Sequence, residues 1–274
     1  MNVEDFLKKN KYTVKDIKYP ITKIKEKEDG VVIYLENKEK INISVDTYFN
    51  YSINTLKGLD DGLYEILKNE EKQYLAYKGI LRKLSAKDFT VKQINDYLKK
   101  NKELSDIEIK DIVDKLLSYG LLDDEKYCIN RVNYLNTQLL STRLIKLKLK
   151  KEGLSSELIN KYVFINEESE HDKARKIAHK YATTVKNKSE NAIKQYIVNK
   201  LVRLGFSYDI AISSLDNLKL YSDSEIILLK KEYVKAKNKY EKKYVKHDLR
   251  NHIYAYLVNK GFKNEDIKEV MEDL

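Results

Sequence analysis

Alternating apolar and polar positions near the start of the chain predict a small β-sheet. The stretches 21–26 (ITKIKE), 31–35 (VVIYL) and 41–45 (INISV) alternate or are rich in β-branched residues. Asp29-Gly30 separates the first two stretches, and this dipeptide is typical of hairpin turns. Because three antiparallel strands are only marginally stable alone, we expect a helix within residues 46–57 to pack on them.

From about residue 61 to the end, apolar residues recur every three or four positions, which predicts helices. Thr90 and Ser105 each precede such a helix and are good N-caps. Gly120 follows the helix that Ser105 begins, as expected of a left-handed helix end. The acids of 123–125 favour the start of the next helix, because they complement its dipole.

One helical pattern recurs: Ile, three residues, Leu, three residues, Gly, then Leu or Phe. Ile and Leu four apart share a helix face, Gly allows a left-handed helix end, and the next apolar residue packs back on the helix. An acid four residues after each Gly marks the first turn of a following helix, with Ser155, Ser207 or Asn264 as its cap. The copies are Ile145/Leu149/Gly153/Leu154, Ile197/Leu201/Gly205/Phe206 and Ile253/Leu257/Gly261/Phe262.

A fourth, degenerate copy at Ile94 and Leu98 lacks the Gly, and the four Ile positions lie 51, 52 and 56 residues apart. A period near 50 indicates helical modules that bury their apolar faces on one another. We therefore predict a mainly α fold, with tandem three-helix repeats in an elongated array after a small N-terminal antiparallel β domain. The predicted boundaries are 1–60 for the β domain and 61–119, 120–166, 167–219 and 220–274 for the repeats.

Composition narrows the classes of protein that the chain can belong to. No apolar run approaches the roughly 18–20 residues that span a bilayer, and the start, MNVEDFLKKN, is unlike a signal peptide. A single cysteine, Cys128, excludes an internal disulfide and suits a reducing cytoplasm. The sequence thus predicts a cytoplasmic protein without a membrane partner.

The formal net charge of +10 points to an acidic partner such as nucleic acid. An AT-rich genome would also supply many lysines, and only six of the 53 basic residues are Arg. The distribution is more informative: residues 1–122 hold 23 basic and 21 acidic residues, whereas 123–274 hold 30 and 22. Five of the six arginines lie in this second part, and residues 126–151 contain seven basic residues and no acid. This segregation favours an anionic partner.

The sequence contains none of the common catalytic motifs for phosphate loops, dinucleotide binding or zinc proteases. Its four histidines are scattered and its single cysteine occupies an apolar helical position, so we expect no metal site and no cofactor. Asp123, Asp124 and Glu125 are interpreted as the acidic first turn of a helix and not as metal ligands. An enzyme is therefore not expected.

The helix predicted at 141–151 carries the clearest basic surface. Arg143, Lys146 and Lys150 are spaced i, i+3 and i+7 on one face. Leu140, Leu144 and Leu147 form one apolar stripe, and Ile145 and Leu149 form another. A helix that is apolar on two sides suits a position between neighbours, with its basic face left for solvent or a partner.

Residues 119–159, YGLLDDEKYCINRV…TRLIKLKLKKEGLSSELI, resemble the RecX family, whose members regulate the bacterial recombinase RecA. The similar features are a Gly-Leu-Leu-Asp-Asp turn, an aromatic residue three positions on, and a basic helix that ends in a Lys-Glu-Gly-Leu run. The β-rich N-terminus looks like the extension of longer members, so the resemblance covers about residues 20–274. The motif residues, which we interpret as structural, are Gly120, Leu122, Asp123, Asp124, Tyr127 and Gly153.

The resemblance implies a non-enzymatic regulator that binds RecA filaments on single-stranded DNA and inhibits strand exchange and ATP hydrolysis, within DNA repair and recombination. We also expect the protein to be a monomer. The candidate contact residues for RecA or DNA are Arg131, Arg143, Lys146, Lys150, Arg175, Arg203 and Arg250. Two alternatives remain open: a sequence-nonspecific nucleic-acid-binding helical repeat protein, and a helical scaffold for an unrelated protein.

Overall fold

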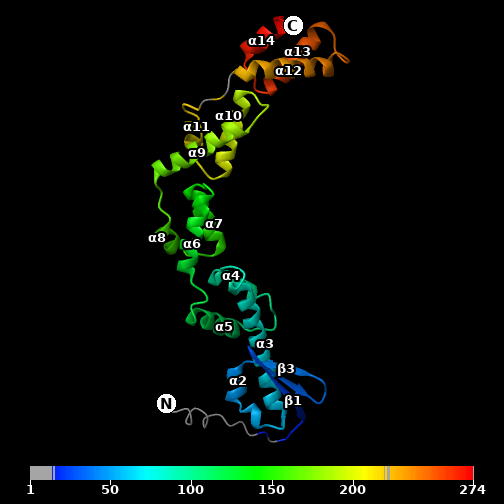
Figure 1. Ribbon diagram of the computed structural model, residues 1–274, viewed down its shortest axis with the longest axis vertical. Coiled ribbons are helices and arrows are strands. Elements are labelled where there is room, and N and C mark those ends of the chain that lie inside the picture. The colour runs from blue at the N-terminus through cyan, green and yellow to red at the C-terminus, as the bar shows by residue number, and fades with distance from the viewer. Residues whose placement is uncertain (1–13, 15, 219, 221–222, 274) are drawn as a thin grey trace. The chain divides into compact units, whose positions relative to one another are not determined.

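The computed structural model describes residues 14, 16–218, 220 and 223–273. It divides into two compact units, Met1–Tyr127 and Cys128–Leu274, which are described separately (Figure 1). The stretch MNVEDFLKKN, expected not to be a signal peptide, lies outside the described residues. The five segments predicted from the sequence are finer than these two units, and their boundaries stay a prediction.

The first unit opens with an antiparallel sheet of the order β3-β2-β1-β4. Its strands are β1 (Tyr19–Lys27), β2 (Gly30–Leu35), β3 (Lys40–Ile43) and β4 (Gly58–Leu59). The predicted hairpin is confirmed, because Lys27 pairs with Gly30 across the turn. The expectation of three strands is wrong by one. The fourth strand has only two residues, which is too short for an alternating pattern, and it pairs with Tyr19 and Pro20 of β1.

The predicted helix within 46–57 is shorter than expected. It comprises α2 (Val45–Asn50) and a separate 3-10 turn, η1 (Ile53–Thr55). Ser52 separates them in a left-handed conformation, with a φ of 51°. Ile53 and Tyr48 enter the core of the β domain, so both pieces pack on the sheet as expected.

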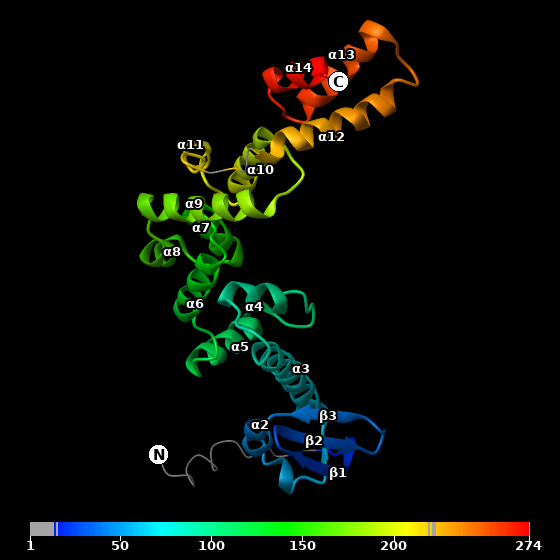
Figure 2. The same cartoon turned by 45° about the horizontal axis from the view of Figure 1, so that its top comes forward.

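Helix α3 (Asp61–Leu84) serves two hydrophobic cores of the first unit. Its first turns place Leu63 and Leu67 in the core of the sheet. Its last turns place Ile80 in a second core, with α4 (Val91–Leu98) and α5 (Asp106–Ser118). Figure 2 shows α3 running from the sheet to these two helices. The helix predicted to begin near residue 61 therefore also connects the β domain to the first helical repeat.

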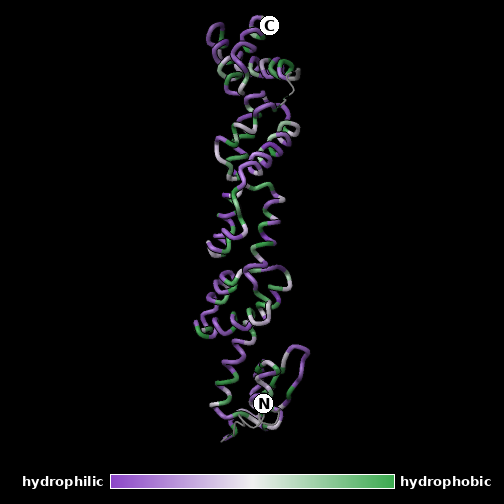
Figure 3. Tube along the Cα trace, turned by 90° about the vertical axis from the view of Figure 1, so that its left-hand side faces the viewer, coloured by the Kyte–Doolittle hydropathy of each residue, from purple (hydrophilic) through white to green (hydrophobic). Residues whose placement is uncertain are grey.

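The second unit repeats one order of helices: a first helix, a second helix that ends at Gly, and a third helix. The amphipathic pattern predicted from the sequence is visible as alternating hydrophobic and hydrophilic stretches along the helices (Figure 3). The mainly helical repeat fold with an N-terminal antiparallel β domain is thus confirmed. The helices are α6 (Asp124–Thr137), α7 (Thr142–Glu152) and α8 (Ser156–Tyr162); α9 (Glu167–Thr184), α10 (Glu190–Arg203) and α11 (Tyr208–Ser213); α12 (Asp223–Tyr240), α13 (Lys246–Asn259) and α14 (Asn264–Asp273).

The glycines of the recurring pattern end their helices as predicted. Gly153, Gly205 and Gly261 have φ values of 100°, 89° and 85°, in the left-handed region. The following apolar residue is buried in each case, and its backbone N–H donates to the carbonyl of the pattern's Leu, at 3.2–3.3 Å. Ser155 and Ser207 cap the next helices as expected. Asn264 does not, because it is already the first residue of α14.

Two of these glycines also face the start of the second helix in the preceding repeat. The backbone N–H of Ser141, the N-cap of α7, donates to the carbonyl of Leu204 at 3.1 Å. A Cβ on Gly205 would lie 2.4 Å from Oγ of this Ser141. A related contact recurs one repeat later, but through the side chain: Ser189 Oγ donates to the Lys260 carbonyl at 2.7 Å, and a Cβ on Gly261 would lie 2.7 Å from this Oγ. Gly205 and Gly261 therefore allow both a left-handed turn and a close contact between repeats.

Candidate functional site

Helix α7 carries the predicted basic surface and is fixed firmly at both ends. Ser141 accepts a hydrogen bond from the Leu144 N–H at its start, and Gly153 ends it. Ile145 and Leu149 are fully buried, which sets the rotation of the helix about its axis. Leu147 is 49% exposed, so the prediction that α7 is covered along two apolar stripes is wrong for this residue.

Arg143, Lys146 and Lys150 form what we call the basic face of α7. Arg143 and Lys150 are exposed, and no described residue forms an ion pair with either of them. Lys146 is half-buried, and its Nζ donates to Asn160 Oδ1 of α8 at 2.8 Å. The face therefore presents two unneutralised cations and a third that is positioned by α8, an arrangement suited to anionic groups.

The basic face belongs to α7 and is not a feature of every repeat. When the repeats are aligned on their glycines, the position of Lys150 is occupied by Val202 in α10 and by Val258 in α13. These valines are 46% and 39% exposed, so the position is accessible in all three repeats. Because packing does not demand a lysine there, its charge is available for a partner.

The other candidate arginines differ in whether they already form ion pairs with described residues of the chain. Arg131 is engaged inside the second unit, where its Nε donates to both carboxylate oxygens of Glu152, at 3.0 and 3.1 Å. Arg175 forms an exposed ion pair with Asp172 at 3.3 Å. Arg203 and Arg250 are exposed and form no ion pair with a described residue. Arg131 is therefore foremost a structural residue, and Arg203 and Arg250 remain candidates for contact.

One lysine in the basic stretch from 173 to 203 has a structural role that the sequence did not reveal. The Nζ of Lys173 donates to Asn136 Oδ1 at 3.0 Å and to the Leu140 carbonyl at 3.3 Å, and its side chain is only 14% exposed. It also pairs with Glu170 one helical turn earlier. Part of the positive charge of this stretch is thus engaged in the contact of α9 with the end of α6 and with the loop that follows it.

The motif residues shape the connection between α5 and α6. Gly120 is left-handed with a φ of 64°, and the Leu121 N–H that follows donates to the Leu116 carbonyl at 2.9 Å. Leu122 is buried in the second core of the first unit. Asp123 accepts a hydrogen bond from the Lys126 N–H at 2.9 Å, as an N-cap of α6 does. Tyr127 follows one turn later, half-buried.

Asp124 has a different role, which recurs along the chain. Its Oδ1 accepts a hydrogen bond from the Val91 N–H at the start of α4, at 2.9 Å. Glu170 accepts in the same way from the Thr142 N–H of α7, and Glu225 accepts from the Glu190 N–H of α10. The second helices α4, α7 and α10 thus each have two caps, one from their own Thr or Ser and one from the first helix of the following repeat, whereas Val245, which precedes α13, supplies no side-chain cap. The distances along the sequence vary, so the pattern was not visible there.

Burial raises the pKa of two of the acids that form these second caps, Asp124 and Glu225. Desolvation raises the pKa of Asp124 above its ordinary value, and the Val91 N–H only partly offsets this shift. Desolvation likewise raises the pKa of Glu225. In both positions the ionised carboxylate is useful as a hydrogen-bond acceptor but costly to bury, which is typical of a structural contact between repeats.

We expect Asp124→Ala to destabilise the first unit by about 1–2 kcal/mol, because the α4 N-terminus loses an acceptor.

The contribution of Asp124 to stability should also change with pH, in a direction that its pKa determines. Since the folded-state pKa of Asp124 is raised, the wild type loses stability relative to Asp124→Asn as pH rises from about 4 through that pKa. Urea unfolding of the three proteins at pH 4 and pH 7, followed by circular dichroism, measures both effects. An Asp124→Asn protein that gains nothing relative to the wild type at the higher pH would contradict the desolvation.

The structure contains no alternative centre for chemistry among its described residues. Within them, no three His, Cys, Asp or Glu side chains gather as metal ligands do. Cys128 is buried in the second unit, in agreement with its prediction as a core residue. Over the same residues, none of the helices combines the length and the apolar character that a membrane span requires.

Comparison with known proteins identifies the family. No protein-family model matches the sequence. Regulatory protein RecX of Streptococcus pyogenes serotype M4 is 31% identical over 252 residues, which cover 90% of this chain and 96% of that protein. Regulatory protein RecX of Streptococcus agalactiae is also 31% identical, over 92% of this chain and 98% of that protein.

The fold agrees with this relationship. A crystal structure of a regulatory protein RecX superimposes with a TM-score of 0.54 at 24% identity, over 72% of this chain and 99% of that chain. The resemblance deduced from the turn at Gly120 and the basic helix is confirmed, and with it the expectation of a regulatory protein. The chain belongs to the RecX family of regulatory proteins.

Proposed function

We propose that this protein regulates RecA by binding RecA filaments on single-stranded DNA and inhibiting strand exchange and ATP hydrolysis. The observation that carries the proposal is the basic face of α7, whose Arg143 and Lys150 are exposed and form no ion pair with a described residue, at positions where α10 and α13 carry no charge. A nucleoprotein filament offers phosphates and carboxylates together, and both are partners for Arg and Lys. Family membership supplies the regulatory role.

A pelleting assay tests this proposal. RecA is assembled on poly(dT) with a slowly hydrolysed ATP analogue, and the fraction of this protein that sediments is compared with the fraction that sediments with poly(dT) alone. We expect tighter binding to the filament than to the bare DNA at the same salt concentration. Equal binding to both would favour a sequence-nonspecific nucleic-acid-binding protein, and no binding to either would favour a scaffold for another partner.

One observation favours the nucleic-acid alternative specifically. At the turn between α12 and α13 the rings of Tyr244 and His252 stack with centroids 3.8 Å apart, and Tyr240 lies 5.7 Å from the same His252 ring. The exposed Lys242, Lys243 and Lys246 lie close to Tyr244 in the sequence, and the exposed Arg250 lies two positions before His252. Aromatic rings among cations are suited to bases and phosphates of a single strand. The sedimentation with poly(dT) alone measures what this surface contributes.

A further inference from the structure

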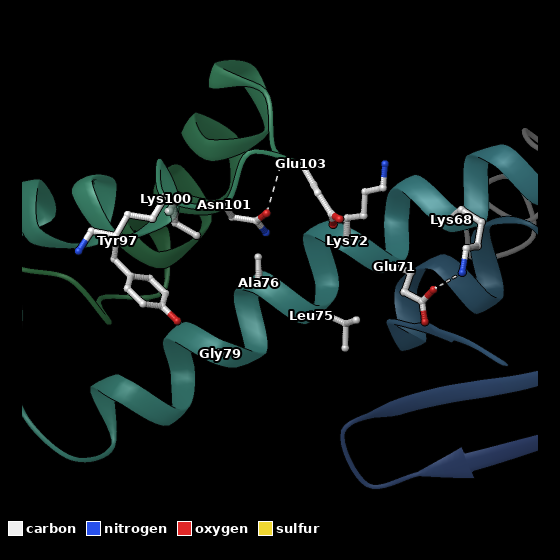
Figure 4. Close-up of a pocket in the computed structure, with 11 residues that line it drawn as sticks. Lys68, Glu71, Lys72, Leu75, Ala76, Gly79, Tyr97, Lys100, Asn101 and Glu103 are labelled. Atoms are coloured by element: carbon white, nitrogen blue, oxygen red, sulfur yellow. Dashed lines mark hydrogen bonds and ion pairs between the residues drawn. The ribbon is translucent and has the colours of Figure 1, made fainter. Parts of the chain in front are cut away.

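A groove in the first unit has features that the fold itself does not require. It lies between α3 and the segment that leads from α4 into α5, and it encloses about 700 Å³. Its floor is formed by Leu75, Ala76 and Gly79 of α3, and Tyr97 of α4 stands at its side (Figure 4). Lys72 and Lys100 lie at its rim. The groove is thus apolar within and charged at the edge, where Glu71 and Glu103 accompany the lysines.

Gly79 is the unusual residue of this groove. It lies inside the 24-residue helix α3, where glycine is unfavourable relative to alanine because it costs backbone entropy. A Cβ at this position would meet no atom within 4 Å, and no left-handed backbone requires glycine there. Gly205 and Gly261 differ in both respects. The chain therefore does not need Gly79 for its own packing, whereas the bare helix backbone lets another molecule approach closely.

The groove also leaves apolar surface exposed to solvent. Leu75 is 49% exposed and Tyr97 is 42% exposed, although their chain neighbours Ala76 and Leu98 pack in the second core of the first unit. A floor that carries only the methyl group of Ala76 and the bare backbone of Gly79, between two exposed apolar residues, fits one bulky apolar side chain of a partner.

The charges at the rim of the groove indicate the charge of the partner. The ammonium of Lys68 pairs with Glu71 at 3.0 Å, and Glu71 accepts two further hydrogen bonds from Asn42, so this pair is engaged within the unit. Lys72 and Lys100 form no ion pair with a described residue. Two available cations on either side of an apolar floor are complementary to an anionic partner.

A polypeptide fits this groove better than a nucleic acid does. The floor is aliphatic, and among the described residues that line this groove only Tyr97 offers an aromatic ring on which a base could stack. Glu103 at the rim would repel a continuous line of phosphates. Separate carboxylates with an apolar residue between them can contact Lys72 and Lys100 and still avoid Glu103.

We infer that this groove receives an acidic segment of a partner protein, with a large apolar side chain over Gly79 and carboxylates at Lys72 and Lys100. The inference rests on the proposed function, in which the protein component of the filament is RecA. It assigns contact with that protein to the first unit, in addition to the basic face of α7.

The test compares Gly79→Leu with the wild type in two binding measurements. One is fluorescence anisotropy of labelled protein against RecA filaments on poly(dT), and the other uses a labelled dT oligonucleotide without RecA. Leucine fills the floor of the groove and favours the helix, so the thermal transition should stay at or above that of the wild type. We expect the affinity for the filament to fall on the order of tenfold, and the affinity for the oligonucleotide to stay unchanged.

A second variant, which changes only surface charge, tests the inference without altering the packing of α3. Lys72→Glu with Lys100→Glu should weaken filament binding similarly, whereas the matched reversal Lys92→Glu with Lys110→Glu, at exposed positions outside the groove, should not. If the Gly79→Leu and Lys72→Glu/Lys100→Glu proteins bind the filament as the wild type does, the inference is wrong and the proposed function stands. If filament and oligonucleotide affinities fall together, the occupant is nucleic acid and not protein. If the wild type itself fails to bind the filament, both proposals fall.

Discussion

Replacing Arg143, Lys146 and Lys150 together by Glu is expected to weaken binding to RecA–single-stranded DNA filaments on the order of tenfold or more. Arg143 and Lys150 are exposed and have no ion pair with a described residue, so the reversal replaces attraction by repulsion. Ile145 and Leu149 hold α7 from its opposite side, so far-UV helicity should be retained. Lys146→Glu also removes the hydrogen bond to Asn160, a single exposed contact.

The salt dependence of binding distinguishes a lost phosphate contact from a general loss of structure. If the three residues contact phosphates of single-stranded DNA, the slope of log affinity against log salt should decrease by about 2 in the variant. The difference between the variant and the wild type should therefore shrink as salt rises. The control is the same reversal at Lys23, Lys25 and Lys27, which are exposed on β1 in the charge-balanced first part of the chain. Equal binding by the two triple variants would place the contact elsewhere, with Arg203 and Arg250 as the next candidates.

Gly205→Val is expected to destabilise the second unit on the order of 3 kcal/mol, because two costs add. A side chain is disfavoured at a φ of 89°, which contributes about 1–2 kcal/mol. The new Cβ would also lie 2.4 Å from Ser141 Oγ and 2.7 Å from the Leu144 Cβ, so the preceding repeat must move. Urea unfolding followed by circular dichroism measures the change.

Gly120 provides the matched control for the steric clash with the preceding repeat. It is also left-handed, with a φ of 64°, but a Cβ there would meet nothing within 4 Å. Gly120→Ala should therefore cost only about 1 kcal/mol, and Gly205→Ala should cost about 1–3 kcal/mol more. If the two alanine variants are equally stable, the contact between Ser141 and the Gly205 turn does not contribute to the stability of the unit.

The parts of the fold that could be predicted from the sequence are those decided by local chemistry. The Gly turns were predictable because an Ile-Leu face, a glycine and an apolar stop residue lie within ten positions, and the caps Thr90 and Ser105 stand immediately before their helices. Strand β4 was missed because two residues cannot show a period of two. The break at Ser52 was missed because no Gly or Pro marks it.

The candidate site was predictable only as far as one helix extends. The spacing of Arg143, Lys146 and Lys150 placed them on one face of α7, and the structure places them there. Tertiary contacts decided the rest: Arg131 pairs with Glu152 across 21 positions, and Lys173 reaches the loop before α7. The acid of each second cap lies 29 to 36 positions from the serine or threonine that caps the same helix, so no fixed spacing reveals it.

The most direct measurement of the central claim is the rate of ATP hydrolysis by RecA on single-stranded DNA, with this protein titrated in at substoichiometric amounts. We expect the wild type to lower the rate of ATP hydrolysis at a ratio well below one molecule of this protein per RecA, and the Lys23/Lys25/Lys27 reversal to act at the same ratio. The Arg143/Lys146/Lys150 reversal should need a much higher concentration for the same decrease. An unchanged rate with the wild type at equimolar concentration would contradict the account.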